Sequence, residues 1–337
     1  MVMLWSGGQA PALIAKRSAL ALMFAALLLA FSAPGAATAQ SYPAKPIRII
    51  VPYGAGGSTD VAARLIAGCL SHSLGQQTYV ENRPGANGII GIEAAAKSAP
   101  DGYTLLAGPA AVASNPHVYR TSIDPTKDLV PIIQLSREPT VLAVHPSLGV
   151  HSLAELIALA RQQPGLRYAT GSGVGSAQHM AVQWFARIAG LELEQVPYRG
   201  GGQAVGELVA GHVKLGALGS TPLLPYYKSG GLRLLAQTTR GRSPSLPEVP
   251  TFEEAGIKGL VFEQWYGVFA PARTPPAITA RLNDEIGKAL ADPEVRRKFL
   301  DSAQEPVGGT AEQFAQIVRE DSAKFGRLVS ELNVKAE

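Results

Sequence analysis

The segment best suited to chemistry is a glycine-rich turn that carries two hydroxyls and a carboxylate. It reads Pro-Tyr-Gly-Ala-Gly-Gly-Ser-Thr-Asp over residues 52–60 and follows an apolar, β-branched run that starts at residue 47. A junction from a strand to a helix leaves backbone N–H groups unpaired beside the positive end of the helix dipole. Such a junction attracts anions, and glycines let a ligand approach the backbone. The candidate ligand-binding residues in this turn are Tyr53, Gly56, Gly57, Ser58, Thr59 and Asp60.

A structural alternative stays open for this turn, in which Ser58 or Thr59 only caps the helix. A second turn, Thr-Gly-Ser-Gly-Val-Gly-Ser at residues 170–176, repeats the arrangement in the other half of the chain. Two such junctions can hold one small anion from both sides. The candidates from this half are Ser172, Ser176 and His179, and Asn115 and Tyr198 fall at predicted strand or loop ends that face the same cleft. For His179, a structural role in its helix is the alternative.

Motifs for several other chemistries are missing from the sequence. It holds no GxxxxGK phosphate loop followed by Ser or Thr, no GxSxG nucleophile elbow, and no HExxH or HxH metal pattern. Residues 171–176 fall short of GxGxxG, so with Glu192 they make only a partial dinucleotide fingerprint. The single cysteine, Cys69, excludes an intramolecular disulfide and a multi-cysteine metal site. We therefore expect no enzyme activity, no cofactor and no metal, with an unrecognised hydrolase that uses His179 as the alternative.

Residues 1–39 are typical of a secretory signal. Lys16 and Arg17 precede an apolar run at residues 18–31, and Ala37-Thr38-Ala39 offers a cleavage site before Gln40. The run is shorter than the roughly 20 residues that span a bilayer, which disfavours a transmembrane anchor. No cysteine follows the cleavage site, so we expect no lipid anchor. The mature chain of residues 40–337 should be soluble and periplasmic.

The charge balance argues against a nucleic-acid partner. The whole chain has 30 Lys and Arg against 26 Asp and Glu, a formal charge of +4. Two of the basic residues lie in the leader, so residues 40–337 carry 28 basic and 26 acidic side chains. Such a balance is not the basic footprint of a nucleic-acid-binding protein.

Strand and helix patterns alternate along the mature chain, which predicts an α/β fold with parallel sheets covered on both faces. The predicted strands are residues 47–52, 78–81, 103–107, 132–135, 141–144, 166–170, 193–197, 214–218, 232–238 and 266–270. The predicted helices are residues 61–74, 88–97, 152–162, 176–189, 203–210, 276–291 and 311–332. Two similar halves and a helical tail predict two lobes, each a mostly parallel sheet flanked by helices, with a ligand cleft between them. The first lobe would comprise residues 40–142 plus 265–337, and the second lobe residues 143–264.

A set of motifs in a fixed order carries a family resemblance. They are residues 42–48 (YPAKPIR), 51–53 (VPY), 56–60 (GGSTD), 80–88 (VENRPGANG), 99–106 (APDGYTLL), 196–200 (VPYRG) and 249–252 (VPTF). With these motifs the chain resembles the Bug-type extracytoplasmic solute receptors of the tripartite tricarboxylate transporter system. The resemblance runs over essentially the whole mature chain.

The resemblance implies a type II-like, two-lobed periplasmic binding protein that closes on a small carboxylate and delivers it to membrane permease subunits. The carboxylate would be held by Tyr53, residues 56–60, Ser172, Ser176 and His179, and Ala110, Ala111 and Asn115 are candidates for the distal part of the ligand. We expect a monomer. The alternative partner is a membrane sensor kinase to which the loaded receptor signals.

One stretch departs from the family pattern. Many members carry an Asp in a Gly-x-Val-Asp stretch where this chain reads Gly-His-Val-Lys, with Lys214 in the place of the Asp. A lysine there either favours a more acidic ligand or faces solvent.

Overall fold

The structure is a computed structural model that describes residues 1–3 and 42–335. Residues 43–337 form one compact unit, separate from residues 1–42. The predicted secretory signal rests on residues 16–39, which lie outside the described residues. Among the helices in the described part of the chain, none has the length and apolar character needed to cross a membrane.

The first sheet combines parallel and antiparallel strands. In spatial order its strands are β2 (Thr78–Asn82), β1 (Ile47–Val51), β3 (Thr104–Pro109), β9 (Glu263–Pro271) and the first part of β4 (Leu129–Val144), and β10 (Glu305–Gly308) pairs with the other edge of β4. β2, β1 and β3 are parallel, whereas β9 runs antiparallel to both β3 and β4. The apolar side chains of β1 are fully buried, as expected for a parallel strand covered on both faces.

The second sheet has the same plan. The last residues of β4 pair with β7 (Leu215–Gly219), next to which lie β5 (Leu166–Thr170) and β6 (Leu193–Pro197), and β8 (Arg233–Gln237) pairs with the other edge of β4. β5, β6 and β7 are parallel, and β4 is antiparallel to β7 and β8. Each sheet is thus mixed rather than mostly parallel, because β4 and β9 run antiparallel to the strands beside them.

A single strand, β4, belongs to both sheets. It pairs with β9 as far as Pro139 and with β7 from Thr140 onward. The sequence predicted two separate strands at residues 132–135 and 141–144, because residues 136–140 are polar or typical of turns. The strand continues because buried partners satisfy these polar groups. Ser136 Oγ, for example, donates to Gln304 Oε1 at 2.5 Å.

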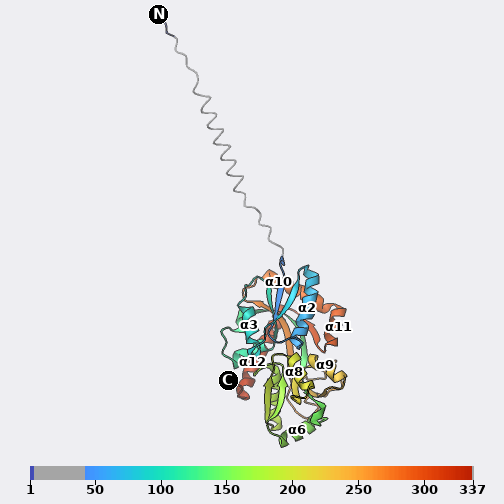
Figure 1. Cartoon of the computed structure of the whole chain (residues 1–337). Coiled ribbons are helices and arrows are strands. Elements are labelled where there is room, and N and C mark those ends of the chain that lie inside the picture. Colours follow the sequence, from blue (N-terminus) through green and yellow to red (C-terminus); the bar gives the residue numbers. More distant parts are fainter. Residues whose placement is uncertain (4–41, 336–337) are drawn as a thin grey trace. The chain divides into compact units, whose positions relative to one another are not determined.

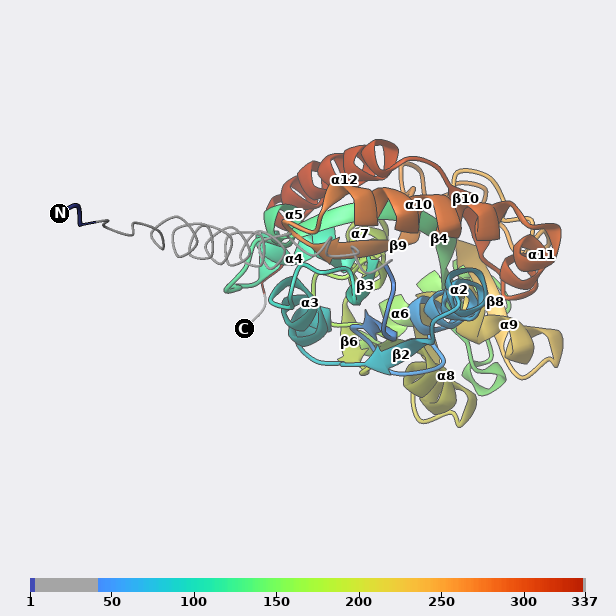
Figure 2. The same cartoon turned by 90° about the horizontal axis from the view of Figure 1, so that it is seen from above.

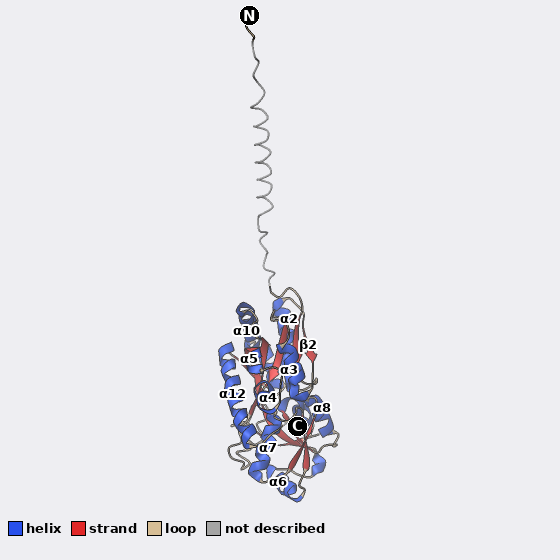
Figure 3. Cartoon of the chain, turned by 90° about the vertical axis from the view of Figure 1, so that its left-hand side faces the viewer, coloured by secondary structure: helices blue, strands red, loops and turns tan. Residues whose placement is uncertain are grey.

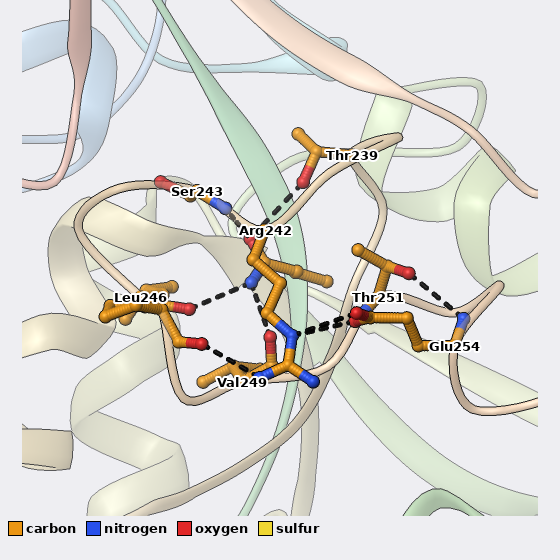
Figure 4. A network of polar contacts seen from close by, with 9 residues as sticks. Thr239, Arg242, Ser243, Leu246, Val249, Thr251 and Glu254 are labelled. Atoms are coloured by element: carbon orange, nitrogen blue, oxygen red, sulfur yellow. Dashed lines mark hydrogen bonds and ion pairs between the residues drawn. The ribbon is translucent and has the colours of Figure 1, made fainter.

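The second connection between the sheets runs from β8 to β9 and is held by a buried amide. Gln237 of β8 donates to the carbonyl oxygens of Leu246 at 3.0 Å and Val249 at 2.7 Å. Arg242 in the same segment pairs with Glu254 at 2.8 Å. Figure 4 shows this network, in which the polar contacts hold the connecting segment against the end of the sheet.

Helices cover the faces of both sheets (Figures 1 and 3). The helices are α2 (Ser58–Leu74), α3 (Ile89–Ala96), α4 (Ala111–Val118), α5 (Pro125–Asp128), α6 (Leu153–Gln162), α7 (Ala177–Ala189), α8 (Gly201–Val209), α9 (Ser220–Lys228), α10 (Pro276–Ala291), α11 (Pro293–Asp301) and α12 (Ala311–Glu331). Short 3₁₀ turns lie at Ala86–Gly88 and Pro146–Leu148. Five of these elements were not expected from the sequence: α4, α5, α9, α11 and β10.

The carboxyl-terminal helices pack on the first sheet. α10 and α12 both contact β4, and α10 also packs on α2 (Figure 2). Beneath α12, the rings of Trp265 and Phe269 contact Phe314 with ring centroids 5.2 and 5.0 Å apart. Aromatic pairs at this separation add stability beyond their buried area. The helical tail therefore covers the strand that joins the two sheets.

Candidate functional site

Four strand ends, two from each sheet, meet at one cavity. β1 and β3 of the first sheet run into α2 and α4, and β5 and β7 of the second run into α7 and α9. β1 lies between β2 and β3, and β5 lies between β6 and β7. Connections that leave a middle strand toward opposite sides open a crevice at the carboxyl ends of the strands. Residues from all four junctions line a cavity of about 40 Å³.

The cavity wall is made of small, hydroxyl, amide and aromatic residues and one carboxylate, Asp60. It consists of Tyr53, Gly54, Gly57, Ser58, Thr59, Asp60, Pro109, Ala110, Ala111, Gly171, Ser172, Ser176, Ala177, Gln178, Gly201, Gly219, Pro222, Gln264, Trp265 and Tyr266. None of these described lining residues is a lysine, arginine, histidine or cysteine. One water needs roughly 10–15 Å³ of such space, so the cavity admits a group of a few heavy atoms.

The N-termini of α2 and α7 supply hydrogen-bond donors to the cavity. The N-cap of α2 is Gly57, which has no side chain to occupy the first N–H groups of the helix. The Thr59 hydroxyl has no hydrogen-bond partner within residues 42–335. Ser176, the N-cap of α7, accepts from His179 N at 3.2 Å, and its own O–H proton stays available. Both helices therefore present donors and the positive end of a dipole to the cavity.

Two predicted residues of these turns use their polar groups to shape the turns. Asp60 accepts from Gly56 N at 3.0 Å, Arg64 Nε at 3.0 Å and Asn82 Nδ2 at 2.9 Å. Burial alone would raise the pKa of the Asp60 carboxyl, but the hydrogen bonds from Arg64, Gly56 and Asn82 outweigh it and lower the pKa. Ser172 Oγ lies in the wall and is 3.3 Å from Gln178 Oε1. Asp60 thus holds the first turn in place.

Four predicted site residues lie outside the cavity wall: Gly56, Asn115, His179 and Tyr198. His179 is 7% exposed, and its Nδ1 accepts from Gly175 N at 3.3 Å. Burial lowers the pKa of His179 to about 4, so the ring is neutral at pH 7. Tyr198 donates its backbone N–H to Thr170 O at 2.8 Å. These positions fix the turns around the cavity.

Asn87 joins the first sheet's junctions to the second glycine turn. Its Oδ1 accepts from Tyr53 OH at 3.0 Å and from Gly173 N at 3.0 Å. Its Nδ2 donates to Asn115 Oδ1 at 2.9 Å and to Val174 O at 3.2 Å. Asn87 has a φ of 49°, a left-handed conformation that asparagine tolerates better than most residues. The predicted site residues Tyr53 and Asn115 are therefore both hydrogen-bonded to Asn87. We call Asn87 and its four partners, Tyr53, Asn115, Gly173 and Val174, the Asn87 clamp, because they join the two sheets.

Glycine backbones also meet directly across the two sheets. Gly54 N donates to Arg199 O at 2.7 Å. A Cβ on Gly200 would lie 2.8 Å from Gly54 N, and between two junctions of the second sheet a Cβ on Gly171 would lie 2.6 Å from Gly201 N. Real Cβ atoms do not come this close to backbone atoms, so these positions need glycine for the approach to exist.

A buried carboxyl, Glu138 of β4, lies next to the cavity wall and is 3% exposed. Its Oε2 accepts from Thr221 N at 3.0 Å and from the hydroxyls of Ser220 and Thr221, both at 2.9 Å. Its Oε1 accepts from Tyr266 OH at 2.5 Å. Glu138 thereby occupies the N-terminus of α9, where an anion is favoured. Sequence reasoning missed Glu138 because it interrupts the predicted strand.

Other wall residues were also missed. Gln178, Gln264, Trp265 and Tyr266 all line the cavity. Gln264 and Trp265 lie on β9, whose pairing with β3 and β4 is set by long-range contacts. Gln178 had a local signal, since it lies two residues after the N-cap Ser176. Lys214, by contrast, is exposed and precedes β7 at its amino end, away from the cavity at the carboxyl end.

Sequence comparison with known proteins identifies the family of this chain. Residues 62–334 match the family model described as tripartite tricarboxylate transporter family receptor. The chain belongs to this family. BugT of Bordetella pertussis is 37% identical to this family member over 304 residues, which cover 88% of this chain and 92% of BugT. A UPF0065 protein from the tcbD–tcbE intergenic region of Pseudomonas sp. strain P51 is 35% identical over 92% of this chain and 93% of its own.

Solved structures of receptors share the fold. Rpa4515 of Rhodopseudomonas palustris, solved with adipate, is 34% identical with a TM-score of 0.84 over 88% of this chain and 100% of its own. MatC of the same species, with bound malate, is 29% identical with a TM-score of 0.80 over 86% of this chain and 100% of its own. The periplasmic binding protein BugD is 28% identical with a TM-score of 0.84 over 88% and 100%. The α/β periplasmic-binding-protein fold predicted from the sequence is confirmed.

Proposed function

We propose that this receptor captures a small carboxylate in the periplasm by closing its two sheets around the cavity, and that it delivers the ligand to a membrane permease. The observation that carries the proposal is that the N-termini of α2 and α7, one from each sheet, line one cavity whose described wall has no basic side chain. The solved relatives with adipate and malate support a carboxylate as the ligand class.

Helix N-termini and hydroxyls suit a carboxylate that must be buried. A buried ion pair costs desolvation of both partners, whereas N–H and O–H donors carry no full charge. Charge-assisted hydrogen bonds to a carboxylate are short and about twice as strong as neutral ones. In this site Thr59 and Ser176 have O–H protons available, and the first N–H groups of α2 have no side-chain cap.

Closure is supported by the contacts between the sheets. The Asn87 clamp and the glycine approach between Gly54 and Gly200 both join the two sides of the cavity. The cavity of about 40 Å³ between these contacts has room for a group of a few heavy atoms and not for a whole dicarboxylate. Entry therefore requires the sheets to part, and contacts that form only after closure then drive the population shift. The wall holds no histidine among its described residues, so the hydrolase alternative, which uses His179, has no imidazole at the cavity.

Thermal melts of residues 40–337 against mono-, di- and tricarboxylates, aromatic acids and amino acids test the proposal. A ligand at 100 times its Kd stabilises by about 2.7 kcal/mol, which for the single unit of residues 43–337 is a Tm shift of roughly 4 °C. Adipate and malate belong in the panel. If no acid raises the Tm, even after denaturation and refolding to remove a copurified ligand, the carboxylate proposal is wrong.

A matched pair of serine variants locates the site. Ser176 and Ser152 are both helix N-caps whose Oγ accepts a backbone N–H at 3.2 Å, but only Ser176 lines the cavity. Both Ser176→Ala and Ser152→Ala should cost about 1 kcal/mol of stability through the lost cap. Only Ser176→Ala should also weaken binding, by about tenfold in calorimetry, because a hydrogen bond to a charged group contributes about 1.5–3 kcal/mol. Equal ligand affinities for the two variants would show that Ser176 does not bind the ligand.

A further inference from the structure

Glu138 is connected to the cavity by two of its wall residues. Tyr266 OH donates to Glu138 Oε1 at 2.5 Å. Ser58 Oγ is a neighbour of the same oxygen, since a Cβ placed on Gly219 would lie 2.0 Å from Glu138 Oε1 and 2.6 Å from Ser58 Oγ, and the Ser58 hydroxyl lowers the pKa of Glu138. Both Ser58 and Tyr266 line the cavity. A ligand carboxylate that accepts a hydrogen bond from Ser58 is therefore one hydroxyl away from a second, protein-borne carboxyl.

The proton of the Ser58 hydroxyl can serve only one acceptor. When Glu138 is ionised, Ser58 donates to Glu138 and presents lone pairs to the cavity, which repel a carboxylate. When Glu138 is protonated, its O–H can donate to Ser58 Oγ, and Ser58 is then free to donate to the ligand. The charge state of Glu138 thus sets the direction of the Ser58 hydrogen bond.

We propose that Glu138 is a positioning residue of the carboxylate site, which takes up one proton from solvent when the ligand binds and so turns the Ser58 hydroxyl toward it. This inference rests on the proposed function, because it needs a carboxylate in the cavity. No bond other than O–H bonds forms or breaks: solvent supplies the proton on binding and receives it on release.

The groups that face Glu138 leave its charge without a counter-ion. Burial raises the pKa of Glu138, opposed by hydrogen bonds from Ser58, Tyr266, Thr221 and Ser220. α9 contributes only N–H and hydroxyl groups, β9 contributes Tyr266, and the α2 junction contributes Tyr53 and Asp60 beyond Ser58. A second negative charge in the cavity raises the pKa of Glu138 further.

Two of the three arginines behind Glu138 are paired elsewhere. Glu138 shares a depression of about 210 Å³ with Arg137, Arg240, Arg242, Glu263 and Glu305. Arg137 pairs with Glu263 at 3.4 Å and with Glu305 at 2.8 Å, and Arg242 pairs with Glu254 at 2.8 Å. Within residues 42–335, no ion pair joins any of these arginines to Glu138. They therefore do not hold the carboxyl in its ionised form.

Calorimetric titration of malate and of adipate into residues 40–337, between pH 6.5 and 8.5, tests the proposal. Two buffers with different ionisation heats give the number of protons taken up per ligand. The wild type should take up between a fraction of a proton and one proton, and its affinity should fall by up to tenfold per pH unit. Glu138→Gln, which is neutral at every pH, should take up none and keep a flat affinity. Glu263→Gln, an exposed glutamate on β9, is the matched control and should behave like the wild type.

The possible outcomes separate this inference from the proposed function. Failure of both acids to bind the wild type overturns the receptor proposal for these ligands and this inference with it. Binding with the same proton uptake in Glu138→Gln as in the wild type, or with no uptake in the wild type, overturns this inference alone. If Glu138→Gln does not fold, the ¹³C carboxyl resonance of Glu138 in the wild type is the second readout: it should move to the protonated position when malate is added, and an unmoved resonance contradicts the proposal.

Discussion

A Cβ on Gly202 of α8 would stand 2.4 Å from the carbonyl oxygen of Ala55 in the first glycine turn. The two residues belong to junctions of different sheets, and they approach through their backbones. A carbonyl oxygen cannot swing aside as the end of a long side chain can. Any side chain at Gly202 must therefore push the two junctions apart.

The first prediction compares two glycines of α8. Gly202→Ala should weaken carboxylate binding at least tenfold, or about 1.4 kcal/mol, because the closed arrangement cannot form. A Cβ on Gly206 meets nothing within 4 Å, so Gly206→Ala should leave affinity unchanged and raise stability by up to about 1 kcal/mol. Calorimetry and thermal melts measure both effects. Equal affinities would mean that binding does not need this approach.

The second prediction concerns the Asn87 clamp. Asn87→Asp keeps the acceptor for Tyr53 and Gly173 but loses the donors to Asn115 and Val174. It should cost about 2–3 kcal/mol of stability and weaken ligand binding at least tenfold, since the lost bond to Val174 joins the two sheets.

Asn283→Asp is the control for the clamp. Asn283 also donates to two carbonyl oxygens, of Ile132 at 2.8 Å and of Gly309 at 3.1 Å, away from the cavity. The Asn283→Asp substitution should therefore lower the stability of the protein without changing its affinity for the ligand. An Asn87→Asp protein with wild-type affinity would show that the clamp is not part of closure.

The third prediction is a stability change with pH that comes from His179. Burial lowers the pKa of His179 to about 4 in the folded protein, against about 6.5 when unfolded. Between these values the unfolded chain binds more protons, so stability rises with pH and is lost as pH falls from 6.5 toward 4. In the wild type, the free energy of unfolding measured with urea should therefore fall between pH 6.5 and pH 5. In His179→Gln this fall should be smaller by about 2 kcal/mol.

The same variant tests the role of His179 in the site. Above pH 7 the ring is neutral in both states, so His179→Gln should bind ligand as the wild type does, because His179 lies outside the wall. His72→Gln, at an exposed position, is the control for the pH series. A large loss of affinity in His179→Gln alone would place His179 in contact with the ligand.

The fourth prediction concerns the buried amide that holds the second connection. Gln237 is fully buried, donates to Leu246 and Val249, and accepts from Ser243 N at 2.9 Å. Gln237→Leu leaves these groups without partners and should lower the free energy of unfolding by at least about 3 kcal/mol. Arg242→Lys, at a partly exposed ion pair, should cost less than about 1 kcal/mol. Chemical denaturation distinguishes the two.

Features coded by neighbouring residues could be predicted from the sequence. The turn at residues 52–60 and the Ser176 cap are local patterns of glycines and hydroxyls, and the structure places nine of the thirteen predicted site residues in one wall. That those nine bind ligand stays a prediction. The strand β5 and the end of α7 at Gly190 were likewise predicted from local signals.

Features that depend on distant partners could not be predicted. α9 contains Pro222 and Pro225, and α4 contains Pro116, which disfavour a helix in isolation. In the sequence, Glu138 looks like a break in a strand. It is accommodated in the strand because hydrogen-bond donors from α9 and Tyr266, which are distant in sequence, surround its carboxyl. Tertiary contacts outweigh local propensity at each of these positions.

The position of β9 constrains the order in which the chain can fold. β9 lies between β3 and β4 in the first sheet, although the rest of the second sheet separates it from them in sequence. A ribosome or an export channel delivers the amino terminus first. At that stage β3 and β4 are both present, but they cannot pair with each other because the strand that lies between them, β9, has not yet emerged. The second sheet needs only residues 140–237 and can form ahead of it, while the first waits for its central strand with two open edges, the kind of intermediate that chaperones shield from aggregation.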